Sequence, residues 1–127
     1  MSNRDYYILT PLNKRAIEDL CRRKIYKRHC KADECIIKDT FKAMIFKEDT
    51  YFYLEDNLFT LINAECDVMI DIYEDEIIWN EQLETVLELT NSLLESSNDE
   101  RFIKLATEFK SLVELAIKKK TVIGFCF

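Results

Sequence analysis

His29 is the only histidine in this chain, so any reaction that needs an imidazole must use it. A Ser/His or Cys/His nucleophilic pair requires that base beside the nucleophile. His29 follows Arg28 and lies close to Lys31, at the end of a strongly basic segment. We therefore expect no catalytic role for His29, and we assign no catalytic residue elsewhere.

Metal binding is the second kind of chemistry that these residues could support. His29, Cys30 and Cys35, with Cys21, are of the types that bind zinc, but no Cys-x-x-Cys pair is present. The five cysteines are odd in number and irregularly spaced, which favours buried free thiols in a reducing compartment. We expect neither a metal nor a cofactor. A small metal-binding or hydrolytic protein that uses His29, Cys30 and Cys35 stays as an alternative.

Carboxylates are the most abundant chemical groups. Asp71, Glu74, Asp75, Glu76 and Glu81 could supply general acid–base pairs or ligands for a hard cation. The sequence between the first and last of them lacks the central Gly and the ligand order of an EF-hand, and the whole chain holds one Gly and no phosphate-binding loop. We therefore predict that the protein is not an enzyme.

The distribution of charge is more informative than any single carboxylate. From Asp49 to Glu100 there are 15 Asp and Glu residues and no Lys or Arg, although the net charge of the chain is only -6. Like charges repel, and neighbouring cations normally relieve that repulsion. A surface of one sign speeds encounter with an oppositely charged partner and helps to select it. This stretch therefore predicts a surface that binds a basic partner.

A basic segment precedes the acidic stretch. It contains Tyr26 and six cations, which are Arg15, Arg22, Arg23, Lys24, Lys27 and Arg28. Such a segment could contact phosphates, but the acidic centre of the chain would repel a nucleic acid. We therefore expect no direct binding to nucleic acid.

The first half of the chain predicts strands at both ends of a helix. A strand over Tyr6–Leu9 should precede a helix that is capped by Thr10, starts at Pro11 and ends near His29 or Cys30. Residues 35–37 are β-prone, and the runs 43–46 and 51–54, joined by a polar turn, predict a β-hairpin.

The second half predicts one short helix, one strand and a helical hairpin. A helix over 55–65 should precede a half-exposed strand over 67–73, followed by a turn at 74–76. A long amphipathic helix should start at Asn80, and a capping box at 97–100 should open another helix that the three lysines of 118–120 close. The apolar run 121–127 predicts a buried final strand.

These elements fit one α+β domain over residues 1–127, with a small mixed or antiparallel sheet, a C-terminal helical hairpin and a closing strand. The start of the chain lacks the pattern of a secretory signal, and no apolar run approaches the roughly 20 residues that span a membrane. We expect a cytoplasmic protein that does not contact the membrane.

The C-terminal residues 80–127 resemble the small immunity proteins of bacterial contact-dependent growth inhibition and other polymorphic toxin systems. The shared features are two amphipathic helices, the spacing Phe109-x-x-Leu112-x-x-Leu115-Ala116, a short basic turn and a closing Val122-Ile123 strand. The resemblance covers less than half of the chain, which lacks the Gly and Pro common in the loops of those families. It implies a cytoplasmic inhibitor that binds one cognate toxin domain, often a basic nuclease, and blocks its active site or substrate groove.

The expected contact surface combines acidic residues with aromatic anchors, which is typical of binding hot spots. The charge would come from Asp71, Glu74, Asp75, Glu76, Glu81, Glu84 and Glu88, and the anchors would be Tyr73 and Trp79. Packing in the core at a helix start is the competing interpretation of Trp79. A phage-type inhibitor or nucleic-acid mimic that acts on a host defence nuclease would use the same acidic surface, and stays as an alternative.

Overall fold

The structure is a computed structural model that describes residues 5–18, 41–71 and 76–127. The strands of the described part form one sheet: β1 (Tyr6–Pro11), β2 (Phe41–Phe46), β3 (Glu76–Ile78) and β4 (Ile123–Cys126). Their order is β2-β1-β4-β3, and every neighbouring pair is antiparallel. The expected α+β fold is confirmed, and of the two sheet types that the sequence left open, the antiparallel one is present.

The sheet has a different set of side chains on each face, because successive residues of a strand point to opposite sides. On one face, residues such as Ile8, Met44 and Phe125 join the main core. On the other face, Leu9, Phe41, Ile77 and Val122 pack with Ala16, which belongs to a helix at 14–18.

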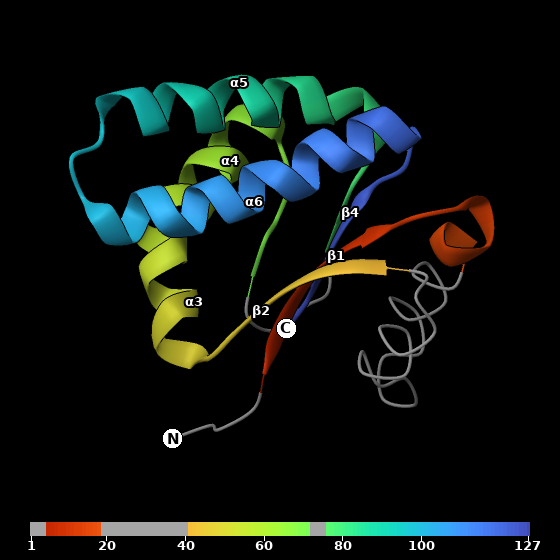
Figure 1. Cartoon of the computed structure of the whole chain (residues 1–127), viewed down its shortest axis with the longest axis horizontal. Coiled ribbons are helices and arrows are strands. Elements are labelled where there is room, and N and C mark those ends of the chain that lie inside the picture. The colour runs from red at the N-terminus through yellow and green to blue at the C-terminus, as the bar shows by residue number, and fades with distance from the viewer. Residues whose placement is uncertain (1–4, 19–40, 72–75) are drawn as a thin grey trace.

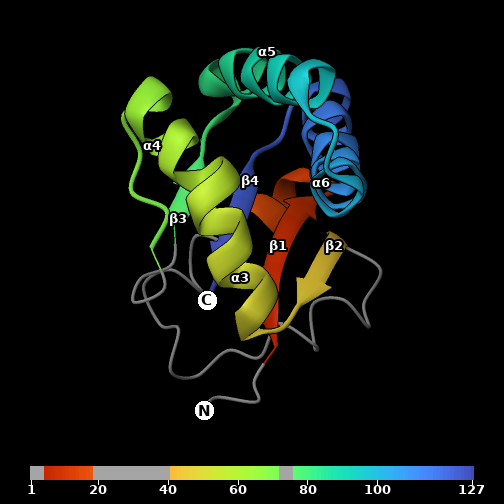
Figure 2. The same ribbon diagram turned by 90° about the vertical axis from the view of Figure 1, so that its left-hand side faces the viewer.

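Two helical layers cover the main face of the sheet (Figures 1 and 2). The first is a continuous rod of α3 (Glu48–Leu54), the π-helix η2 (Glu55–Phe59) and α4 (Thr60–Cys66). The second is the hairpin of α5 (Asn80–Ser96) and α6 (Glu100–Lys119), which was predicted and is confirmed. None of the described helices is long and apolar enough to cross a membrane.

Aromatic rings fill the space between the sheet and the helical rod. Tyr51 lies 5.3 Å from Tyr6 and 5.0 Å from Phe127 between ring centres, and Phe59 lies 5.6 Å from Phe125. Pairs at such distances add to the stability that burial alone provides. The final residues of the chain are therefore part of the core, as their apolar sequence predicted.

The π-helix sits in the middle of the rod and has side chains that satisfy its widened backbone. Thr60 donates from both its backbone N–H and its Oγ1 to the carbonyl of Glu55, the latter at 2.7 Å. Asn57 Nδ2 donates to the carbonyl of Tyr53 at 2.8 Å. The extra residue of this turn lets the adjacent Leu58 and Phe59 both be buried.

Two predictions in the first half of the chain were wrong. The run 51–54 is not a strand but the end of α3, and β2 pairs with β1 instead. Thr10 is not a helix cap, since it lies inside β1 and its Oγ1 donates to the carbonyl of Leu112 at 3.2 Å. The helix at 14–18 is capped by Asn13, whose Oδ1 accepts from Ala16 N at 2.8 Å.

Further along, several predicted boundaries were also wrong. Residues 68–70 are not part of the sheet, and the strand is instead Glu76–Ile78, whose first residue was expected to end a turn. Helix α5 begins at Asn80, as predicted, with Trp79 in the N-cap position, whereas Asp99 caps α6 with its side chain where a capping box at 97–100 was expected. The helix end near His29, the strand at 35–37 and residues 72–75 lie outside the described residues.

Candidate partner-binding surface

Three segments meet at one corner of the molecule: the end of α4, the link over residues 67–71 and the start of α5. Gln82 connects them, because its Nε2 donates to the carbonyl of Cys66 at 2.8 Å and its Oε1 accepts from Trp79 N at 3.3 Å. Gln82 is the third residue of α5, from which a long amide side chain can reach back to the N-cap. The start of α5 is therefore fixed against the end of α4.

Side-chain hydrogen bonds hold the first part of the 67–71 link, and Asp71 at its end forms a β-bridge. Asp67 ends α4 with a φ of 53°, a left-handed conformation that Asp tolerates better than most residues. Asn63 donates to Ile70 O at 3.1 Å and accepts from Ile70 N at 2.8 Å. Val68 and Ile70 are buried, whereas Met69 is 68% exposed. The expected alternation of buried and exposed residues is thus present here without the expected strand.

Two large apolar side chains are exposed at this corner. Met69 projects from the link, and Trp79, at the start of α5, is 44% exposed. The exposure of Trp79 favours its interpretation as an anchor, because a core tryptophan would be largely covered. Met69 was not among the contact residues predicted from the sequence.

An acidic ridge begins beside Trp79 and follows the outer face of α5. Glu81, Glu84, Glu88 and Glu95 are spaced by three, four and seven residues, which places them on one side of a helix, and all four are exposed. We call these four residues the α5 ridge. Its ends are about 21 Å apart along the helix axis, at 1.5 Å per residue. The opposite side of α5 is buried through Leu83, Val86 and Thr90.

The ridge is not neutralised within the part of the chain that the structure describes. The ion pairs there join Lys47 to Asp5 at 2.6 Å and Arg101 to Asp49 at 3.6 Å, and none includes a ridge glutamate. Within the described ranges, then, the carboxylates of α5 present one field of negative charge.

The predicted contact residues have different places in the structure. Glu81, Glu84 and Glu88 lie together on the outer face of α5, and Trp79 is the exposed residue that precedes this helix. Glu76 has a structural role, since its Oε2 accepts from Met69 N at 3.1 Å and its Oε1 from Ile77 N at 3.0 Å. Asp71 is half-buried in the link. Tyr73, Glu74 and Asp75 lie outside the described residues.

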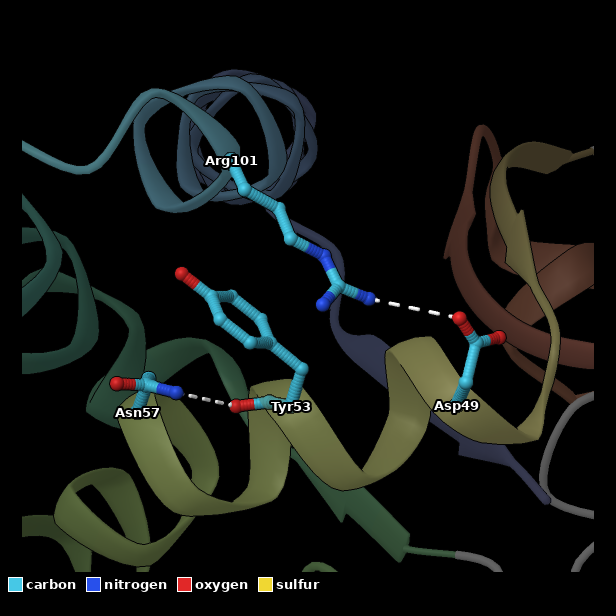
Figure 3. A network of polar contacts seen from close by, with 4 residues as sticks. All are labelled: Asp49, Tyr53, Asn57 and Arg101. Carbon is cyan, nitrogen blue, oxygen red and sulfur yellow. Dashed lines mark hydrogen bonds and ion pairs between the residues drawn. The ribbon is translucent and has the colours of Figure 1, made fainter.

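A second group of polar contacts connects α3 with the start of α6 (Figure 3). Tyr53 donates its hydroxyl to Asp99 Oδ2 at 2.5 Å, and the guanidinium of Arg101 lies 4.3 Å from the centre of the Tyr53 ring. Arg101 Nη2 also pairs with Asp49 Oδ2. No signal in the sequence indicated this group, because its members come from segments about 45 residues apart.

This group shifts the pKa of two of its members in opposite directions. The hydrogen bond from the Tyr53 hydroxyl is the main cause that lowers the pKa of Asp99, and backbone N–H donors of α6 lower it further. Partial burial raises the pKa of Tyr53, and the hydrogen bond to Asp99 raises it further. Asp99 is therefore ionised, and Tyr53 is protonated, at neutral pH.

The described residues do not provide a metal site or a reactive thiol in this region. Across residues 5–18, 41–71 and 76–127, no three His, Cys, Asp or Glu side chains gather in an arrangement that could hold a metal ion. Burial raises the pKa of the Cys66 thiol, and the charge of Glu65 adds to that effect, so the thiol stays protonated at neutral pH. His29, Cys30 and Cys35 lie outside the described residues.

No protein-family model matches this chain, and no curated protein or solved structure matches it. The α5 ridge, Met69 and Trp79 are therefore interpreted from their own geometry and charge.

Proposed function

We propose that this protein is an immunity protein that binds a cognate toxin domain with a basic surface, of the nuclease type, and blocks it. The observation that carries the proposal is the α5 ridge, a row of exposed carboxylates that begins beside an exposed tryptophan. Of the two features, the ridge supplies charge complementarity and Trp79 supplies contact area. Aromatic anchors inside a charged surface are typical of binding hot spots.

The proposed mechanism is competition with the nucleic acid for the same groove. Nuclease grooves are cationic because they bind phosphates, and a row of carboxylates on a rigid helix can occupy the same cationic positions. Helix α5 is fixed at its start by Gln82 and packs along α6, so the ridge does not have to become ordered when it binds. Such preorganisation lowers the entropic cost of association.

Trp79 and Met69 would add the apolar part of the contact. They lie at the corner where the 67–71 link meets the start of α5, next to the first ridge residues. Methionine adapts its shape to a partner surface, and tryptophan buries a large area with little loss of side-chain freedom.

The experiment compares two double variants that remove the same charge from two helices. Glu84→Gln with Glu88→Gln neutralises the middle of the ridge, and Glu108→Gln with Glu114→Gln neutralises two exposed residues of α6 as a matched control. The partner is the toxin encoded beside this gene, isolated by co-expression, and the association rate is measured by surface plasmon resonance at several salt concentrations.

We expect the ridge variant to associate roughly tenfold more slowly at low salt and to lose most of its salt dependence. The control variant should stay within about twofold of the unmodified protein. Equal effects of the two variants would contradict the proposal, because the charge would then act without regard to place. Inhibition of a host defence nuclease, with no effect on the neighbouring toxin, would favour the phage-type inhibitor.

A further inference from the structure

A pocket lies at the far end of α5 from Trp79, where the turn between α5 and α6 approaches the π-helix. Its volume is about 160 Å³, and it is lined by Asn57, Leu93, Ser96, Ser97, Asp99 and Phe102. Leu93 and Phe102 supply an apolar wall, and the other four residues supply polar groups. The ridge residue Glu95 directly precedes Ser96, so the last residue of the α5 ridge and the pocket are at the same end of the helix.

Two of the polar side chains of the lining offer acceptor oxygens. Asn57 Nδ2 donates one of its two N–H groups to Tyr53 O at 2.8 Å, a carbonyl that can only accept, and this fixes the amide so that the acceptor Oδ1 and one N–H remain (Figure 3). Ser96 Oγ donates to the carbonyls of Ser92 and Leu93, both at 3.2 Å, which leaves its lone pairs. Both residues therefore offer acceptors to anything that enters.

Asp99 adds an ionised acceptor. Its carboxylate receives hydrogen bonds from the Tyr53 hydroxyl, from Arg101 N at 3.0 Å and from the backbone of Phe102, which leaves about one of its four acceptor positions for a further bond. Asp99 and Asn57 are both exposed, so a ligand can reach them. The hydroxyl of Ser97, which accepts from Asp99 N at 3.2 Å, is the remaining polar side chain of the lining.

Arg101, the cation nearest to the pocket in the sequence, is held elsewhere. Its guanidinium lies over the Tyr53 ring and pairs with Asp49. Asp49, Tyr53 and Asn57 follow each other at intervals of four residues along the rod, and Figure 3 shows Asn57 and the Arg101–Asp49 pair on opposite sides of Tyr53. The Arg101 guanidinium is thus directed to Tyr53 and Asp49, although its charge also helps to lower the pKa of Asp99.

We propose that this pocket binds an alkylguanidinium group, the tip of an arginine side chain from the basic partner. A guanidinium carries a positive charge and five N–H donors, which suits the carboxylate of Asp99 together with the acceptor oxygens of Asn57 and Ser96. The methylene groups of such a side chain would lie against Leu93 and Phe102. The claim that this arginine belongs to a toxin partner rests on the function proposed above, whereas binding of a guanidinium to the pocket does not.

The position of the pocket fits a partner that also contacts Trp79. Helix α5 has 17 residues and is therefore about 25 Å long, so the pocket and Trp79 lie at the two ends of one helix. A standard protein interface buries about 800 Å² on each partner, enough to cover a helix of this length. A single basic partner could then place one arginine in the pocket while the α5 ridge lies against its cationic groove.

The test is an NMR titration of the full isotope-labelled protein with N-ethylguanidinium, and separately with tetramethylammonium. Tetramethylammonium carries the same charge but has no N–H donor. We expect N-ethylguanidinium to shift the side-chain amide of Asn57 and the backbone amides of Ser96, Ser97 and Asp99, with saturation in the roughly millimolar range typical of such small ligands. We expect no saturable shift with tetramethylammonium. Absence of saturation, or equal shifts with both cations, would overturn the proposal.

Matched variants separate a specific contact from the general negative field. Asp99→Asn removes the charge of the pocket and keeps a good helix cap, and Glu95→Gln removes one charge from the neighbouring residue that does not line the pocket. We expect Asp99→Asn to weaken guanidinium binding about fivefold or more and Glu95→Gln less than about twofold. Equal effects would refute the pocket. Ser96→Ala, which removes one acceptor at an exposed site, tests the same point if Asp99→Asn does not fold.

This titration needs no partner, so its result is independent of the toxin experiment. If guanidinium binding saturates but no partner binds through the α5 ridge, the pocket is supported and the claim that a partner protein supplies the arginine is refuted. Ridge-dependent binding of the toxin without guanidinium binding would refute the pocket and leave the proposed function in place.

Discussion

Asn63 holds the backbone of Ile70, the residue after Met69, and its replacement tests how the 67–71 link is held. Asn63→Ala removes the two hydrogen bonds of 2.8 and 3.1 Å to the backbone of Ile70, a residue that is 3% exposed. A lost hydrogen bond costs about 1 kcal/mol, and a buried group left without a partner costs more. We therefore expect a loss of about 2 kcal/mol in the free energy of unfolding, which corresponds to a Tm about 6–8 °C lower for a domain of this size.

Two assays measure this change. Urea unfolding gives the loss of stability, and hydrogen exchange should show the amide of Ile70 exchanging about 30-fold faster, the factor that 2 kcal/mol represents. Asn98→Ala is the matched control, because Asn98 is exposed and its side chain has no hydrogen-bond partner in the described ranges, and it should change stability by less than about 0.5 kcal/mol. If Asn63→Ala and Asn98→Ala cost the same, or if exchange at Ile70 is unchanged, Asn63 does not hold the link.

Two further predictions concern titratable groups. The folded state lowers the pKa of Asp99, so the stabilising contribution of this residue should be present at neutral pH and disappear as the pH falls below about 3.8. The urea midpoints of the unmodified protein and of Asp99→Asn should therefore converge in acid. A constant difference between the two midpoints from pH 7 to 3 would contradict the role of the Asp99 charge. Burial raises the pKa of Cys66, so this thiol should react slowly with iodoacetamide at pH 8. Peptide mapping should show alkylation of Cys66 that is at least about tenfold slower in the folded protein than in urea. Equal rates would show an accessible thiolate.

The C-terminal half was the most predictable part of the fold, for a physical reason. In α6, apolar residues such as Phe102, Phe109 and Val113 recur with helical spacing and are all buried, and the lysines at its end suit the helix dipole. The following apolar run had to enter a sheet, and β4 does so. Here the local preference and the tertiary packing agree.

The errors occurred where packing overrides local preference. The run of Tyr51, Phe52, Tyr53 and Leu54 is β-prone by composition, but Tyr51 and Leu54 lie three residues apart on the buried side of a helix. The true partner of β2 is β1, with Tyr6 opposite Phe46, and a pairing over 40 residues leaves no local signal. The same is true of Thr10, whose hydroxyl meets the carbonyl of Leu112 in α6.

In the candidate site, too, some features could be predicted from the sequence and others could not. The α5 ridge could be predicted, because charge and helical spacing are both visible in the sequence. The structural use of Glu76 and the contacts of Asn63 and Gln82 could not, since they depend on where the 67–71 link passes. The pocket beside Asn57 depends on the π-helix, and the sequence gives no sign of one.

The place of β4 in the sheet has a consequence for biosynthesis. This strand lies between β1 and β3, and Tyr7 pairs with Cys126, which is 119 residues later in the chain. On the ribosome, β1 can pair with β2 early, but its second neighbour emerges only when almost the whole chain has been translated, and β3 has no other strand to pair with among those described. Long-range pairings of this kind slow folding and expose apolar strands in the nascent chain. The sheet can therefore close only after translation of residues 123–126, and truncation before them would divide it.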